Sequence, residues 1–137
     1  MENQQDTAST LKMIADYMEK GFLDNIVDMF KRDKSLYLLI GSLIGDERSR
    51  VRIGTVALVE TLKAKDADNL LSAIAGIAEF LNASNATIRG DAAYLLGIIG
   101  HRDALAFLKE NTNDENELVR ETVEEAIEEI KDRDADA

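Results

Sequence analysis

Apolar residues recur along three segments of this chain with the spacing of one face of an α-helix. Aligned without gaps, the segments read VRIGTVALVETL (51–62), IRGDAAYLLGII (88–99) and VRETVEEAIEEI (119–130). Their mostly apolar positions are the first, fifth, eighth, ninth and twelfth, which corresponds to i, i+4, i+7, i+8 and i+11. Each segment is therefore predicted to be a helix that buries one side.

A second helical stretch precedes each of these segments, and short polar turns separate the two members of each pair. The preceding stretches are KSLYLLIGSLI (34–44), DADNLLSAIAGIAEFL (66–81) and DALAFLKE (103–110). A recurring helix pair of this size is typical of an α-solenoid, in which neighbouring pairs bury each other's faces. The pattern predicts an all-α solenoid of about seven or eight helices, with repeats at 34–63, 66–99 and 103–131.

The two ends of the chain are predicted separately from the repeats. Near the N-terminus, apolar residues stand at i, i+3, i+4 and i+7: Leu11, Ile14, Ala15 and Met18. Helical spacing continues through GFLDNIVDMFKR, so residues 1–33 are expected to form either an N-terminal helical cap or a degenerate repeat. Residues 132–137 are expected to form a frayed acidic tail.

The turns and second helices of these pairs resemble those of the HEAT-repeat family, including the HEAT-like repeats of phycobilin lyases. The residues that carry the resemblance are DERSRVR (46–52), TIRGDAAYLLGIIG (87–100) and DENELVRETVEEAIEEI (114–130). The resemblance implies a right-handed superhelix of HEAT-like helix pairs. It also implies a ladder in which an aspartate of the turn and an arginine six residues later stack from repeat to repeat.

Arginine stands at the second position of all three segments. In two of them an aspartate lies six residues earlier, and the pairs are Asp46–Arg52 and Asp114–Arg120. The middle segment has Arg89, but Ala83 occupies the place of the aspartate. There Asn82 or Asn85 could substitute, or Arg89 could pair with an aspartate of a neighbouring repeat. We interpret this column as structural, with each arginine hydrogen-bonded and partly buried between turn and helix.

Arg48 and Arg50 have no counterparts in the other two segments, so they are not ladder residues. One interpretation is solvated surface charge balanced by Asp46 and Glu47. The other is a contact for an acidic partner segment or a phosphate.

The third, sixth, seventh and tenth positions of each segment point away from its buried face. In the first two segments they hold mainly small and apolar residues, namely Ile53, Val56, Ala57 and Glu60, then Gly90, Ala93, Tyr94 and Gly97. If exposed, they would form an apolar patch on a concave surface, and such patches mark contact sites; alternatively, neighbouring repeats cover them. The candidate partner-binding residues are Ile53, Val56, Ala57, Glu60, Ala93, Tyr94, Arg48 and Arg50.

The net charge of −11 is concentrated at one end, with −2 over residues 1–109 and −9 over residues 110–137. Acidic residues fill the outward positions of the third segment: Glu121, Glu124, Glu125, Glu128 and Glu129. One interpretation is that the terminal repeat of a solenoid needs a polar outer face for solubility. The other is that these residues form an acidic surface that attracts a basic partner. The acidic balance argues against nucleic-acid binding.

The sequence offers little for catalysis, and no catalytic residue, metal site or cofactor is predicted. It has no cysteine, and its one histidine, His101, falls in a predicted turn. There is no His or Cys cluster for zinc and no glycine-rich phosphate loop. No apolar run approaches the ~20 residues that span a membrane, and the first residues lack signal-peptide features, so a cytoplasmic location is expected.

These observations predict a non-enzymatic protein–protein interaction module or adaptor. Its concave surface, lined by the second helices, would receive a helix or loop of another protein. The alternatives are nucleic-acid or anion binding through Arg48 and Arg50, and an accessory domain of a lyase-like enzyme system. We expect a monomer or weak homodimer that does not bind membranes.

Overall fold

The structure, a computed structural model, describes residues 4–136 of the chain. Its α-helices are α1 (Gln4–Glu19), α2 (Leu23–Arg32), α3 (Ile40–Ile44), α4 (Ser49–Leu70), α5 (Ile74–Glu79), α6 (Ala86–Ile99), α7 (Leu105–Lys109) and α8 (Glu117–Asp136). Short 3-10 helices flank α3, α5 and α7: η1 (Lys34–Leu39), η2 (Leu71–Ala73), η3 (Phe80–Asn82) and η4 (Arg102–Ala104). Within the described residues no β-strand occurs.

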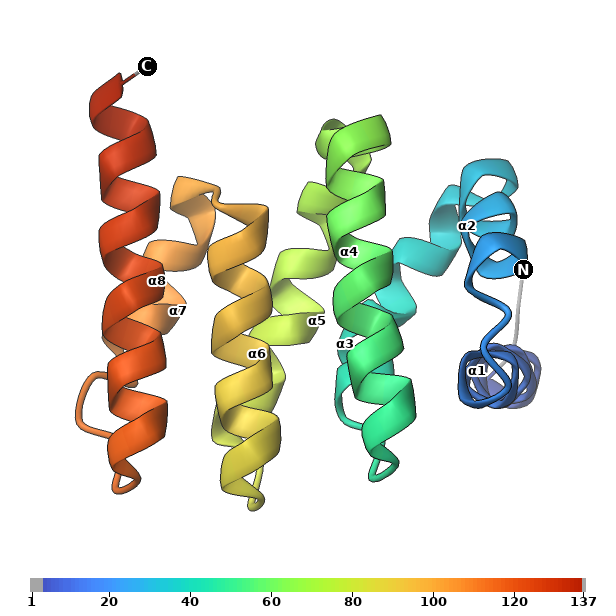
Figure 1. Cartoon of the computed structure of the whole chain (residues 1–137), viewed down its shortest axis with the longest axis horizontal. Coiled ribbons are helices and arrows are strands. Elements are labelled where there is room, and N and C mark those ends of the chain that lie inside the picture. Colours follow the sequence, from blue (N-terminus) through green and yellow to red (C-terminus); the bar gives the residue numbers. More distant parts are fainter. Residues whose placement is uncertain (1–3, 137) are drawn as a thin grey trace.

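The helices form two layers. α4, α6 and α8 lie side by side in one layer, and α3, α5 and α7 lie behind them in the other (Figure 1). Each long helix packs on the shorter helix that precedes it, and within their layer α6 packs on both α4 and α8. This arrangement confirms the predicted all-α solenoid of helix pairs.

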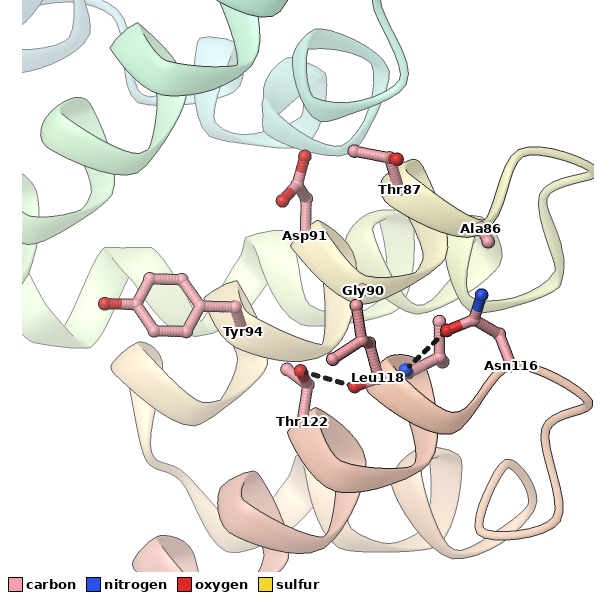
Figure 2. Close-up of a pocket in the computed structure, with 9 residues that line it drawn as sticks. Ala86, Thr87, Gly90, Asp91, Tyr94, Asn116, Leu118 and Thr122 are labelled. Atoms are coloured by element: carbon pink, nitrogen blue, oxygen red, sulfur yellow. Dashed lines mark hydrogen bonds between the residues drawn. The ribbon is translucent and has the colours of Figure 1, made fainter.

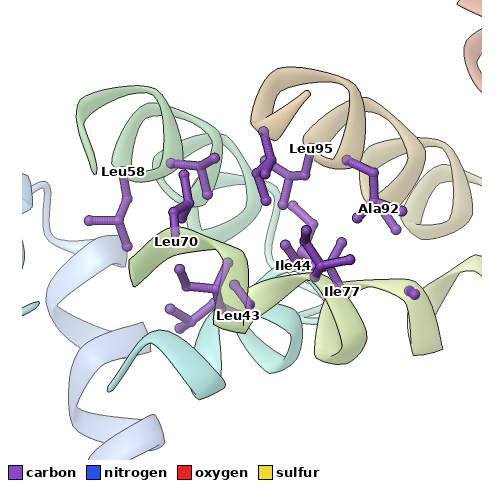
Figure 3. Packing of buried hydrophobic residues seen from close by; sticks show 14 of the residues in the cluster. Leu43, Ile44, Leu58, Leu70, Ile77, Ala92 and Leu95 are labelled. Atoms are coloured by element: carbon purple, nitrogen blue, oxygen red, sulfur yellow. The ribbon is translucent and has the colours of Figure 1, made fainter. Parts of the chain in front are cut away.

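The core lies between the two layers. Every apolar-column position of the three aligned segments is buried, from Val51 to Leu62, from Ile88 to Ile99 and from Val119 to Ile130. Figure 3 shows side chains from both layers meeting there, among them Leu43, Ile44, Leu58, Leu70, Ile77, Ala92 and Leu95. The hydrophobic pattern of the sequence thus correctly predicts which side of α4, α6 and α8 is buried.

The boundary between the first two pairs lies where the sequence predicts it, between residues 63 and 66. α4 (Ser49–Leu70) is interrupted there by a kink at the non-helical residue Asp66 (φ −156°, ψ 56°), which separates the long helix from the start of the second pair. The Asp66 carboxylate accepts hydrogen bonds from Lys34 Nζ at 2.7 Å, from Tyr37 Oη at 2.9 Å and from Asn69 Nδ2 at 2.9 Å. These bonds hold the kink, and they join it to the start of the first pair.

α1 and α2 close the N-terminal end. α1 is seen end-on in Figure 1, so it runs across α4, whereas α6 and α8 run alongside α4. α1 and α2 both pack on α4. This crossing favours a cap over a regular repeat for the segment 1–33, of which residues 1–3 lie outside the described part.

The C-terminal segment differs from its prediction. α8 continues through Asp136, so residues 132–136 are helical where fraying was expected, and Ala137 lies outside the described part. Arg133 accounts for part of this extension, because it donates to Glu129 Oε1 at 2.7 Å and to the carbonyl oxygen of Ile98 at 3.4 Å. None of the described helices is both long enough and apolar enough to cross a membrane.

Candidate functional surface

Arg52 ties its own turn to the next pair. Its Nη1 donates to the carbonyl oxygens of Asp46 and Glu47, both at 2.8 Å, and its Nε donates to Asp91 Oδ2 at 3.1 Å. Asp91 lies on α6. The arginine therefore links α4 to α6 at the N-terminal ends of both helices.

Arg89 makes the same kind of link between α6 and the third pair, and it is more deeply buried. Its Nη1 donates to the carbonyl oxygens of Ala83 and Ser84, at 3.0 and 3.1 Å. Its Nε and Nη2 form a two-pronged contact with Asp114, at 2.9 and 3.1 Å. Of the open alternatives for the middle repeat, the structure selects the aspartate of the neighbouring repeat. The Arg89 contact lowers the pKa of Asp114.

Arg120 completes the set, which we call the arginine ladder (Arg52, Arg89 and Arg120). Its Nη1 donates to the carbonyl oxygen of Asp114 at 2.7 Å. The predicted six-residue pairs are thus correct in position but not in chemistry. In both, the arginine binds the backbone carbonyl of the aspartate, while the carboxylate binds another arginine: Asp46 binds Arg48, and Asp114 binds Arg89.

Arg48 and Arg50 bind α1 and their own turn. Arg48 holds both carboxylate oxygens of Asp46 at 3.0 Å and reaches Asp16 on α1 at 3.1 Å. Arg50 donates to the carbonyl oxygen of Glu19, at the end of α1, at 3.3 Å. Arg48 is therefore already paired with two carboxylates, and Arg50 reaches a helix C-terminus, where positive charge is favourable. This geometry does not support the predicted partner-binding role of either arginine.

A second inter-repeat link joins the opposite ends of the long helices. The carbonyl oxygen of Ile98, in the last turn of α6, accepts from Lys63 of α4 and from Arg133 of α8. Burial lowers the pKa of Lys63, and the nearby Arg133 lowers it further. Sequence reasoning missed this link, because a cation that binds a backbone oxygen of another helix leaves no spacing signal.

Three large apolar side chains remain exposed on the layer of α4, α6 and α8, which we call the α4/α6/α8 face. Ile53 is 70% exposed, Tyr94 is 52% exposed and Leu118 is 71% exposed. They come from three successive long helices. Leu118 was missed in the sequence, because it lies one residue before the aligned third segment.

The other predicted patch residues divide into three groups. Glu60 is exposed as predicted, whereas Val56 and Ala57 are half-buried. Ala93 is fully buried, so its assignment to the binding surface is wrong. The reason is that α6, as a central solenoid helix, packs on α4 on one side and on α8 on the other.

A groove runs between α6 and α8 on this face, with a volume of about 320 Å³. Gly90, Tyr94, Leu118 and Thr122 line it, as Figure 2 shows. Tyr94 and Thr122 also border a smaller depression further along the same two helices, where Glu125 and Glu129 lie at the rim.

A second groove lies between α4 and α6 and shares Thr87 and Asp91 with the first. Ile53 and Val56 line its α4 side. Burial raises the pKa of Asp91, and the bond from Arg52 opposes this rise. The face therefore combines exposed apolar side chains with shallow grooves and polar rims.

The single histidine has a structural role. His101 Nδ1 accepts a hydrogen bond from the backbone N–H of Asp103 at 3.1 Å and so caps η4. In the part of the chain that the structure describes, no group of three or more His, Cys, Asp or Glu side chains could hold a metal ion.

A sequence model of HEAT repeats matches residues 37–128, about two-thirds of the chain. The chain therefore belongs to the HEAT-repeat family. No curated protein and no solved structure matches it significantly. The match is to HEAT repeats as a whole, so the narrower likeness to phycobilin-lyase repeats stays a hypothesis.

Proposed function

We propose that this protein is a non-enzymatic interaction module, an adaptor that binds another protein on the α4/α6/α8 face in the cytoplasm. HEAT repeats generally mediate protein–protein interaction. The observation that carries the proposal is the exposure of Ile53, Tyr94 and Leu118 on three successive helices beside the grooves. Exposed apolar side chains rimmed by polar residues are typical of contact sites.

The polar side chains that could suggest other functions already have structural partners. His101 caps a turn, and Arg48 is held by two aspartates. These contacts favour binding over catalysis, and they weaken the alternative of anion or nucleic-acid binding through Arg48 and Arg50. The acidic net charge of −11 opposes nucleic-acid binding as well.

Site-specific photocrosslinking tests the proposal. The photoactivatable residue benzoylphenylalanine is placed at Tyr94 in the full chain, and irradiation is carried out in an extract of the source organism. We expect a discrete crosslinked protein at Tyr94, because an exposed tyrosine beside a groove can anchor a partner.

Phe107 provides the matched control. It is an aromatic residue that is 37% exposed on α7, in the other layer. The same photoactivatable residue at Phe107 should not yield the Tyr94 product, and Ile53→Asp should diminish that product. Equal products at both positions, or none at Tyr94, would rule out this face as the binding surface.

A further inference from the structure

We infer that the groove between α6 and α8 receives a basic amphipathic helix of the partner protein. The inference rests on the proposed function, and it adds the chemistry and the secondary structure of the partner. Three observations support it: the shape of the groove, the charge at its rim, and a glycine that the fold does not need.

The groove and the smaller depression follow each other along α6 and α8 and share Tyr94 and Thr122. Together their α8 side runs from Leu118 to Glu129, which is about 16 Å at 1.5 Å per residue, or three helical turns. Their floor on α6 is small or apolar, with Gly90 in the groove and Ile98 in the depression, and the exposed Tyr94 lies between these two residues. A partner helix with an apolar stripe at i, i+3, i+4 and i+7 matches this length and floor.

The depression that continues the groove is bordered by two carboxylates on α8, Glu125 and Glu129, and both are exposed. Arg133 binds Glu129, so among the described residues Glu125 is the border carboxylate without a cation. Of the other nearby cations, Arg52 is bound to Asp91, and Lys63 binds the carbonyl oxygen of Ile98. Lysine or arginine beside the apolar stripe of the partner would complement this rim.

The same charge argues against a second copy of this chain as the occupant. A symmetric dimer through this face would bring Glu125 and Glu129 of both copies into one interface. Like charges placed together at an interface oppose association. The chain end that carries these residues, 110–137, has a net charge of −9.

Gly90 is a glycine inside α6 that internal packing does not require. A Cβ atom at position 90 would meet only the Cγ2 of Val119, at the ordinary contact distance of 3.9 Å. By contrast, a Cβ at Gly97 would lie 3.1 Å from the Cβ of Ala126 on α8. Because a glycine weakens a helix, its presence at an open position beside the groove fits close approach of a partner backbone.

The test uses two synthetic helical peptides, each about 18 residues long so that they can form stable helices. Both carry the same leucine stripe, and the remaining positions are lysine in one peptide and glutamate in the other. Fluorescence anisotropy of the labelled peptides measures their affinity for the full chain. We expect the lysine peptide to bind and the glutamate peptide not to bind.

Two pairs of substitutions on α8 are matched in helix, in spacing and in the number of carboxylates removed, and the first pair also releases Arg133 from Glu129. Glu125→Gln with Glu129→Gln neutralises the rim, whereas Glu124→Gln with Glu128→Gln neutralises exposed residues that do not line the groove. The first pair should weaken the affinity for the lysine peptide about fivefold, and the control pair should weaken that affinity less than about twofold.

Gly90→Ala independently tests the close approach of the partner helix to α6. It should leave the melting temperature unchanged or higher, and yet weaken peptide binding, because a methyl group would keep the partner helix away from α6. Unchanged affinity in this variant would overturn the close approach.

The remaining outcomes also decide the inference. It is overturned if the glutamate peptide binds as well as the lysine peptide, if both glutamine pairs act equally, or if neither peptide binds. Sedimentation that shows a dimer weakened by Tyr94→Ala would make a second copy the occupant. In each case, crosslinking at Tyr94 tests the proposed function separately, since that product does not depend on the charge of the partner.

Discussion

Arg89 shows how this solenoid uses a charged side chain as a structural tie. It is 8% exposed and makes hydrogen bonds to two carbonyl oxygens and to both oxygens of Asp114. A buried charge is tolerated when its donors are satisfied and its charge is paired. Arg52 makes the same links with less burial and a single bond to Asp91.

These differences predict an order of stability losses among the arginines. Arg52→Ala should cost about 1–3 kcal/mol, because it strands two carbonyl oxygens and Asp91. Arg89→Ala should cost more, because it leaves the buried carboxylate of Asp114 without its cation. Arg50→Ala should stay within about 0.5 kcal/mol, since its single bond is long and exposed. Urea titrations measure all three, and equal losses would contradict the structural role of the ladder.

Asp66 predicts a dependence of stability on acid. Hydrogen bonds from Lys34, Asn69 and Tyr37 lower its pKa from 3.8 to about 2. A carboxyl group whose pKa is lower in the folded state stabilises the protein above its unfolded pKa, and this contribution is lost as pH falls toward the folded pKa. The loss attributable to Asp66 therefore lies between about pH 4 and about pH 2.

Asp66→Asn should consequently be less stable than the unmodified chain at neutral pH and lose less stability on acidification. Asp68→Asn is the control, because Asp68 is exposed and lies only two residues away. Urea unfolding at a series of pH values from about 7 to about 2 measures both variants. Parallel pH profiles for Asp66→Asn and the unmodified chain would refute the role assigned to this kink.

At the scale of helices, the approach of α3 to α5 depends on glycine. A Cβ atom at Gly41 would collide with the backbone carbonyl of Gly76, which cannot move aside as a flexible side chain could. Gly41→Ala should therefore destabilise the fold by about 1–3 kcal/mol through overpacking.

Gly90→Ala is the opposite case: it should raise the free energy of unfolding by up to about 1 kcal/mol, because alanine favours the helix more than glycine does. Both substitutions add one methyl group to a helix, so thermal unfolding of the two variants isolates the effect of the neighbour. If Gly90→Ala lost as much stability as Gly41→Ala, the space beside Gly90 would not be open to a methyl group.

The helices themselves could be predicted from sequence because burial repeats with helical spacing. The burial of the apolar positions between Val51 and Leu62, and of their counterparts in the other two segments, can be predicted from that spacing alone. What surrounds each helix on its two flanks could not be predicted in the same way. Ala93 and Tyr94 are adjacent in sequence and both are predicted to point away from the buried face, yet the first is fully buried and the second is 52% exposed.

The same limit applies to polar contacts. A spacing of six residues places Arg52 near Asp46, but it does not show whether the backbone oxygen or the carboxylate accepts the bond. Asp91 and Asp114 are the carboxylate partners because adjacent repeats pack in a particular register. Only the arrangement of helices in space contains that information.

For the molecule as a whole, polar links join the repeats at both ends of the long helices. The arginine ladder lies at their N-terminal ends, and the link from Lys63 and Arg133 to Ile98 lies near the C-terminal end of α6. The apolar core fills the space between them. Such a layer can present the α4/α6/α8 face as a preformed surface, which reduces the entropy lost on binding.

The uneven charge of the molecule leads to a final prediction about salt. Added salt weakens two opposing effects: attraction within the ladder and repulsion among the carboxylates of α8. Exposed charges are screened far more than buried ones. The Arg89–Asp114 pair is buried, whereas Glu121, Glu124 and Glu128 are exposed. Salt should therefore weaken the repulsion among the carboxylates of α8 more than the attraction within the ladder. As a result, the melting temperature should rise between about 0.05 M and about 0.5 M NaCl.

The variant Glu124→Gln with Glu128→Gln tests the cause of this rise. It removes two of the repelling charges but leaves the ladder intact, so its melting temperature should start higher and rise less with salt. Thermal unfolding followed by circular dichroism at several salt concentrations gives both slopes. A melting temperature that falls with salt in both proteins would mean that attraction in the ladder outweighs repulsion in α8. The acidic helix would then be no electrostatic burden on the fold, and its charge would have to be explained by the surface it presents to a partner.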